Sequence, residues 1–204
     1  PKYVTPLVIP PVLFDDGGAP LTAEVSLRQI NQQVLPAGFP ATPLCAYGDA
    51  TPGREATFNN PAFTFEVTQN TPTTVTWIND LVDANGNYLP HLLPIDRSLH
   101  WANPELLMCA DGSTTTDCRP ADSNGDILQQ PYTGPVPIVT HVHGAHVGPE
   151  SDGYPEAWWL PDANNIPAGF ATTGTLVNQY GAPTNTAPGI GSFTYQNDQP
   201  STTL

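Results

Sequence analysis

Short runs in which apolar and polar side chains alternate constrain the fold of this chain more than any other feature. The run Phe63–Thr68 places Phe or Val at every second position. Because successive side chains of a β-strand point to opposite faces, this period of two is typical of half-buried strands. The sequence has no amphipathic helix of any length and no internal repeat, and its 25 prolines and 17 glycines divide it into short segments. These features predict an all-β protein, an antiparallel β-sandwich of short strands joined by long loops.

The same alternation predicts where the strands lie. Residues 63–68 and 75–79 are expected to form a hairpin around a turn at 69–72, because turn residues separate the two runs. Residues 1–20, rich in Pro and Gly, are expected to form an extended N-terminal arm. Residues 21–204 are then a single domain, with little periodicity over 88–134 and a long loop over 160–190. The other expected strands are residues 22–34, 41–47, 136–143 and 193–195, with the start of one more at Thr202–Leu204.

The charge balance narrows the classes of partner. The chain carries a formal net charge of −14 and a single lysine, Lys2. Such a surface repels phosphate, which disfavours nucleic acids and anionic membranes, and it attracts cations, including metal ions. The simpler interpretation is an ordinary soluble acidic surface.

Three cysteines give a second constraint. Cys109 and Cys118 flank a short acidic loop, and their spacing permits a disulfide worth about 2.5–3 kcal/mol from loop closure. A zinc-binding Cys pair is the alternative, although no further Cys or His lies nearby in the sequence. Cys45 is left over, as a buried thiol or as one half of a bridge to another chain. A disulfide would place the protein outside the cytosol, and a chain that begins at Pro1 without a signal peptide is expected to be a mature or trimmed product.

Two histidines end one of the expected strands. His141 and His143 are two residues apart, so their imidazoles lie on the same face of a strand, whereas Val142 points the opposite way into the core. Gly144 allows the backbone to turn directly afterwards. Two imidazoles in this arrangement suit two ligands of one metal or one ligand on each of two adjacent metals; the alternative is a pair of ordinary hydrogen-bonded histidines.

The residues that follow extend this motif. His141-Val-His-Gly followed by Ser151-Asp-Gly-Tyr-Pro-Glu-Ala-Trp158 resembles the first copper-binding motif of multicopper oxidases, and it looks most like the bacterial spore-coat laccase and bilirubin oxidase branch. His91–His100 is similar to the segment that precedes the copper motif in that branch. The strand pair at 63–68 and 75–79 looks like the pair that opens the family's first cupredoxin domain.

The resemblance implies a cupredoxin-like Greek-key β-sandwich and a set of residue roles. His141 is expected to bind the type 2 copper and His143 a type 3 copper of a trinuclear cluster, with imidazole well suited to copper. Asp152 occupies the position of an acidic residue near the cluster and is expected to relay protons, or else to cap local backbone as a turn aspartate. His91 and His100 are expected to be structural, satisfied loop histidines. His146 is either an additional copper ligand or a solvent-facing or second-sphere residue.

The resemblance also implies that the chain is incomplete as an oxidase. In the family a second His-x-His pair and a His-Cys-His motif supply the remaining ligands of four coppers, and neither occurs here. We therefore expect residues 21–204 to be a first cupredoxin-like domain truncated before the second His-x-His motif. A partner polypeptide, or the remainder of the same oxidase, is then needed to oxidise a phenol, an aromatic amine, a bilin or a metal ion and to reduce dioxygen to water.

Two other hypotheses belong to different classes. One is a lone cupredoxin-like module that binds copper or zinc at His141 and His143 without oxidase activity; it predicts tight metal binding by the isolated chain. The other is a structural subunit with an inert His pair, which predicts no metal. For the oxidase, the resemblance implies an extracytoplasmic location in a bacterium: periplasmic, secreted, or at the cell or spore surface.

Overall fold

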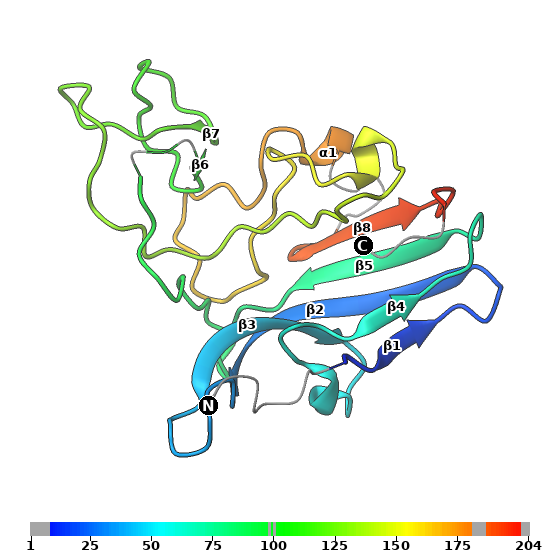
Figure 1. Cartoon of the computed structure of the whole chain (residues 1–204). Helices are drawn as coiled ribbons and strands as arrows, with labels where there is room; N and C mark the ends of the chain where they lie inside the picture. The colour runs from blue at the N-terminus through cyan, green and yellow to red at the C-terminus, as the bar shows by residue number, and fades with distance from the viewer. Residues whose placement is uncertain (1–8, 98, 100, 181–186, 201–204) are drawn as a thin grey trace.

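The chain folds into layered β-sheets (Figure 1). The structure is a computed structural model and describes residues 9–97, 99, 101–180 and 187–200. Among these residues the predicted all-β, cupredoxin-like sandwich class is confirmed. The strands are β1 (Val12–Asp15), β2 (Leu21–Gln32), β3 (Thr42–Asp49), β4 (Thr64–Glu66), β5 (Thr73–Asn79), β6 (Trp101–Ala102), β7 (Asp117–Cys118) and β8 (Ile190–Tyr195), and the helical turns are η1 (Glu55–Thr57), η2 (Pro149–Ser151) and α1 (Val177–Tyr180).

The largest sheet has the order β3-β2-β5-β8. Its strands coincide with four of the predicted ones, and Ala23 and Val25 of β2 are buried on its inner face as the alternation predicted. β2 pairs antiparallel with β3, and β5 pairs antiparallel with β8, but β2 and β5 run parallel. The sheet is therefore mixed, and the expectation of a wholly antiparallel sandwich is wrong for this central pair.

The predicted hairpin of residues 63–68 and 75–79 is wrong. β4 pairs in parallel with β1 in a separate two-stranded sheet, while β5 lies in the centre of the large sheet. The Asp16 carboxylate holds the end of β4 beside β1, because it accepts hydrogen bonds from the backbone N–H and the hydroxyl of Thr68, at 2.6 and 2.8 Å, two residues after β4. The alternation identified both strands but carries no information on which neighbour each one pairs with.

The two sheets enclose one core. Val25, Val75, Trp159, Phe193 and Tyr195 form its buried centre. Phe14 of β1 and Phe65 of β4, with ring centroids 5.0 Å apart, pack against this centre from the opposite sheet. The segment predicted as an N-terminal arm thus supplies β1. The expected strand at Thr202–Leu204 lies outside the described residues.

The remaining chain forms long loops. In the described part of residues 88–134 the short pair β6 and β7 are the only strands, as the lack of periodicity predicted, and this pair lies at the end of the molecule away from β1 and β4 (Figure 1). Residues 160–180 and 187–189 are largely irregular and contain α1. Within the described ranges, no helix has the length and apolarity needed to cross a membrane.

Candidate metal centre

The histidine motif lies on an extended segment rather than on a full strand. The expected strand 136–143 has one ladder contact, in which Ile138 and Trp159 exchange two backbone hydrogen bonds of 3.0 Å, and a turn begins at His143. Pro135 and Pro137 explain this, because proline cannot donate to a strand ladder. Buried Asn79, at the end of β5, compensates by donating to the carbonyl oxygens of Val136, at 2.8 Å, and Trp159, at 3.2 Å. The segment is therefore fixed to the large sheet just before the motif.

The structure brings the two histidine rings together. Their centroids are 5.8 Å apart and the ring planes meet at 70°. Both residues are exposed, whereas Val142 between them packs against the core, as the alternation predicted. Two imidazoles this close, facing solvent on one side of the chain, can present nitrogen ligands to one metal or to two adjacent metals.

A backbone contact selects the tautomer of His141. Its Nδ1 lies 2.5 Å from the carbonyl oxygen of Asp152 and 3.3 Å from the carboxylate oxygen Oδ1 of the same residue. A carbonyl oxygen only accepts, so Nδ1 must carry the hydrogen and donate it. The lone pair is then on Nε2, which is free to bind a metal, and a hydrogen bond of this kind is how metal-ligating histidines are usually oriented.

A glycine makes this contact sterically accessible. Gly153 has φ +78°, and a Cβ atom built there would lie 2.1 Å from the carbonyl oxygen of Thr140 and 3.0 Å from Cβ of His141. No side chain fits at these distances, so glycine is required for the turn to reach His141. The turn itself is attached to the sheet by Ser151, whose Oγ accepts a hydrogen bond of 3.1 Å from the backbone N–H of Thr194 in β8.

His146 does not complete a ligand set. Its side chain is 80% exposed, and its Nδ1 lies 3.3 Å from the carboxylate of Asp198, beyond β8. In the described part of the chain, no three His, Cys, Asp or Glu residues are grouped closely enough to hold a metal ion. Among the described residues, His141 and His143 can therefore offer a metal only two of the ligands that a closed site needs.

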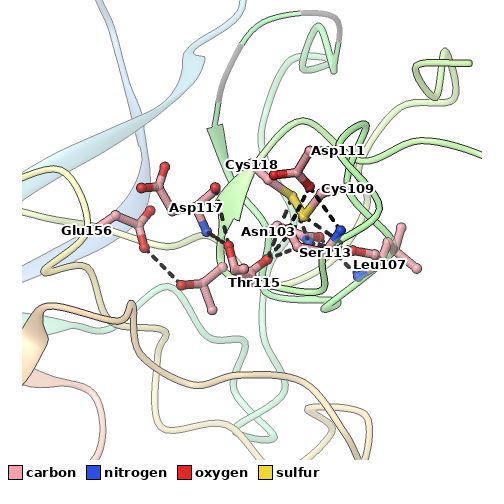
Figure 2. The surroundings of a disulfide bond; sticks show 10 residues. Asn103, Leu107, Cys109, Asp111, Ser113, Thr115, Asp117, Cys118 and Glu156 are labelled. Atoms are coloured by element: carbon pink, nitrogen blue, oxygen red, sulfur yellow. Dashed lines mark hydrogen bonds between the residues drawn. A yellow bond between two sulfur atoms is a disulfide. The ribbon is translucent and has the colours of Figure 1, made fainter. Parts of the chain in front are cut away.

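The disulfide is confirmed, and the zinc-pair alternative is wrong. Cys109 and Cys118 are bonded, with Cα atoms 5.7 Å apart, and both are buried. Figure 2 shows that fully buried Asn103 organises the loop; its amide donates to the carbonyl oxygens of Leu107 and Thr115, each at 2.9 Å.

Glu156 connects this loop to the histidine motif, a role that the sequence did not reveal. It is only 6% exposed, and its carboxylate accepts a hydrogen bond of 2.8 Å from the hydroxyl of Thr116 in the disulfide loop (Figure 2). A second, longer contact of 3.3 Å comes from the hydroxyl of Thr175. A glutamate in a run of aromatic residues signals burial, but its partners are 40 and 19 residues away along the chain and cannot be read from the motif.

Cys45 and His91 share a different cavity. Cys45 is a free, half-buried thiol whose pKa burial raises. It lines a cavity of about 360 Å³ together with His91 and Leu92. Burial lowers the pKa of His91, and its ring packs edge-on against Tyr132. The expectation of a satisfied loop histidine is wrong for His91, because its buried Nε2 has no hydrogen-bond partner in the described structure. His100 lies outside the described residues.

Comparison with known proteins gives one consistent result. No protein-family model matches the chain. It is 31% identical over 159 residues, 77% of its length, to multicopper oxidase LPR1 homolog 3 of rice, Oryza sativa subsp. japonica, and 28% identical over 79% of its length to a laccase of Bacillus subtilis. Over 67% of its length it is 32% identical to multicopper oxidase LPR2 of Arabidopsis thaliana.

These matches cover 21%, 24% and 16% of the respective relatives, so the chain spans about a fifth of their length. Plant and bacterial proteins match about equally well, which supports the family and not the spore-coat branch in particular. Over the matched three quarters of its length, the chain is a homologue of the multicopper oxidases.

Proposed function

We propose that this chain forms part of a laccase-like multicopper oxidase and gives that enzyme one His-x-His pair of its copper cluster. In this proposal Nε2 of His141 binds the type 2 copper and His143 binds one copper of the type 3 pair. The observation that carries the proposal is the contact of 2.5 Å between Nδ1 of His141 and the Asp152 carbonyl oxygen, because it leaves Nε2 unprotonated and aimed away from the turn.

Copper, when bound, would supply one-electron oxidation of a donor and reduction of dioxygen to water. The residues of this chain orient the histidine ring and provide a route for protons. The Asp152 carbonyl oxygen holds the proton on Nδ1 of His141 and so fixes the ring, while Gly153 keeps the turn close. The Asp152 carboxylate is 54% exposed and lies 3.3 Å from the ring, where it can pass protons from solvent toward the site.

The ligand count supports the need for further domains. Two imidazoles do not make a closed site, and the described residues supply no third ligand. We therefore propose that residues 21–204 are a first cupredoxin-like domain, completed by a partner polypeptide or by the rest of the same oxidase. The donor is a phenol, an aromatic amine, a bilin or a metal ion, and the protein works outside the cytosol, where the Cys109–Cys118 disulfide is stable.

Metal content, visible spectrum and intact masses of the purified material test this proposal. The chain alone should bind copper weakly, and His141→Ala and His143→Ala should each abolish that binding. His146→Ala is the matched control, because this exposed histidine pairs with Asp198, and it should leave binding unchanged. Near-stoichiometric copper with an intense blue absorption should occur only with a second polypeptide that supplies a Cys ligand. Tight binding of one metal ion by the chain alone, without a second polypeptide, would instead support the lone metal-binding module.

A further inference from the structure

Two loops of this chain share one hydrogen-bonding plan. They hold the two Asn-Gly dipeptides of the sequence, Asn85-Gly86 within residues 83–87 and Asn124-Gly125 within residues 122–126. In each loop the Oδ1 atom of the first aspartate accepts hydrogen bonds of 2.8 to 3.0 Å from the backbone N–H groups two and four residues later. The glycine N–H donates to the carbonyl oxygen of the same aspartate, at 2.9 and 3.0 Å, and φ of the two glycines is +75° and +83°. The two dipeptides therefore have the same local geometry, and a difference in their reactivity must come from their surroundings.

The Asn-Gly dipeptide is chemically reactive. The backbone nitrogen that follows an asparagine can attack Cγ of the asparagine side chain and close a five-membered succinimide ring. Glycine favours this attack, because it has no Cβ to shield the nitrogen and because its backbone can reach the rotated conformation that ring closure needs. Ring closure requires the peptide between the two residues to leave its hydrogen-bonded turn, so the rate depends on how firmly the turn is held.

The loop at 83–87 is held firmly by a neighbouring segment. The Asn164 amide donates a hydrogen bond of 2.8 Å to the carbonyl oxygen of Asn85, and the Asn164 backbone N–H donates one of 2.8 Å to the carbonyl oxygen of Gly86. Oδ1 of Asn165 accepts a further bond of 2.8 Å from the N–H of Tyr88, directly after the loop. A Cβ atom built at Gly86 would lie 2.6 Å from the Asn164 amide nitrogen, so this side chain covers the dipeptide. Rotation of the Asn85-Gly86 peptide must therefore break contacts to another part of the chain.

The loop at 122–126 stands free of such support in the described structure. Residues 123–126 are exposed, and a Cβ atom built at Gly125 would have nothing within 4 Å. The hydrogen bonds that the structure describes for Asn124 go to the Asp122 carboxylate, from the backbone N–H at 2.8 Å and from the side-chain amide at 3.4 Å. The second distance is that of a weak bond. Only the local turn must therefore open before Asn124 can react.

We propose that Asn124 is a site of spontaneous deamidation and that Asn164 protects Asn85 from the same reaction. This inference is independent of the proposed function, because the reaction needs no metal, oxidant or partner. Three additional hydrogen bonds oppose opening of the loop that contains Asn85. The reaction at Asn124 should therefore be at least about tenfold faster than the reaction at Asn85.

The chemistry balances with water alone. The Gly125 nitrogen gives its proton to hydroxide and forms a bond to Cγ of Asn124. The Cγ–Nδ2 bond breaks, and Nδ2 takes up a proton and leaves as ammonia. Water then opens the succinimide at either carbonyl carbon, which gives aspartate at position 124 or, with the chain running through the side-chain carbon, isoaspartate. The net change converts one amide and one water into one carboxylic acid and one ammonia.

The modification alters both the charge and the backbone of the loop. The new carboxylate adds a negative charge between Asp122 and Asp126. Isoaspartate also lengthens the backbone by one carbon, so Oδ1 of Asp122 no longer meets both of its N–H partners at their present spacing. The loop closes a hairpin whose Ala121 N–H donates a bond of 2.7 Å to the carbonyl oxygen of Met108, beside disulfide-bonded Cys109. Isoaspartate should therefore loosen the hairpin next to the disulfide.

Timed incubation of the purified full chain tests the proposal. The chain is kept at mildly alkaline pH in water labelled with heavy oxygen, and fragmentation mass spectrometry of its peptides measures the label at each dipeptide and separates isoaspartate from aspartate. We expect label to enter at Asn124 at least about tenfold faster than at Asn85. Both rates should rise with pH, because the attack needs the deprotonated glycine nitrogen. In the urea-denatured chain the two rates should be nearly equal, because the residues on either side of the two dipeptides are similar.

Asn164→Ala separates protection from intrinsic reactivity. It removes the amide bond to the Asn85 carbonyl oxygen and uncovers Gly86, so the rate at Asn85 should rise severalfold while the rate at Asn124 stays unchanged. Asn178→Ala, at an exposed asparagine of α1, is the matched control and should change neither rate. Circular dichroism checks that both variants are folded.

Two results would overturn the proposal. Equal rates at the two dipeptides in the folded chain, or a faster reaction at Asn85, would show that the loop contacts do not govern the chemistry. An unchanged rate at Asn85 in folded Asn164→Ala would remove the protective role of Asn164.

Discussion

The ring of His141 is oriented by the backbone of Asp152, not by its carboxylate alone: Nδ1 lies 2.5 Å from the carbonyl oxygen and 3.3 Å from Oδ1. Because every residue type has a carbonyl oxygen, the shorter of these two contacts does not depend on the identity of residue 152. The carboxylate remains exposed to solvent and is available for a separate role in proton transfer. Binding and proton delivery should therefore be separable by mutation.

Asp152→Asn tests that separation. Copper affinity should stay unchanged, because the carbonyl oxygen that orients His141 is retained, while oxygen reduction by the complete oxidase should fall by about a hundredfold or more if the carboxylate relays protons. Copper titration and oxygen uptake measure the two quantities. Asp198→Asn, which alters an equally exposed carboxylate paired with His146, is the control and should affect neither. Undiminished oxygen uptake in Asp152→Asn would assign this residue a structural role.

Gly153→Ala should lower both stability and copper affinity. A side chain at φ +78° costs about 1–3 kcal/mol from backbone strain. The added Cβ also clashes with the Thr140 carbonyl oxygen at 2.1 Å and pushes the turn away from His141. Gly112→Ala is the matched control, because it has nearly the same backbone strain, at φ +83°, but nothing lies within 4 Å of the new Cβ. The difference between the two variants therefore measures the effect of the clash. Thermal unfolding and copper titration should show a larger loss for Gly153→Ala; equal losses would contradict the steric role.

The sequence predicted those parts of the fold and the site that depend on local periodicity. The alternation located β2, β3, β5 and β8 and placed Val142 in the core, because side-chain direction in an extended chain follows from position alone. It could not identify pairing partners, so the pairing of β4 with β1 and the Asp16 contact at the end of β4 were missed. Pro135 and Pro137 prevent a full strand at the histidine motif, but the rings of His141 and His143 still lie close together.

The contacts around Glu156 show why the rest of the site was not predictable. Its carboxylate is held by Thr116 and Thr175, which reach it only through the folding of two long loops. Such partners are separated along the chain and leave no periodic signal, so only coordinates reveal them. The orientation of His141 by a backbone oxygen was equally unpredictable, because every residue has a carbonyl oxygen and the sequence does not show which one the ring contacts.

Reduction of the Cys109–Cys118 bond should destabilise the chain by about 2.5–3 kcal/mol, the loop-closure value for a bridge of this span. The midpoint of thermal unfolding should therefore fall in the presence of a reductant or in the Cys109→Ala/Cys118→Ala double variant. Because the Thr116 hydroxyl reaches Glu156 from this loop, copper affinity should fall with it. Cys45→Ala should keep the full response to reductant, since this thiol takes no part in the bridge. A midpoint that does not respond to reductant would mean that the loop is held by its other contacts.

His91 should make stability depend on pH in the mildly acidic range. Burial lowers its folded-state pKa below the unfolded value of about 6.5, so the unfolded chain binds a proton first. Stability is therefore fully present above pH 6.5 and is lost as the pH falls from there through the folded-state pKa. His91→Phe keeps an aromatic ring against Tyr132 but cannot titrate, so its free energy of unfolding should decline less between about pH 7 and pH 5. Denaturant unfolding of both proteins at several pH values measures the difference. Parallel curves would show that His91 is protonated equally easily in the folded and unfolded chain.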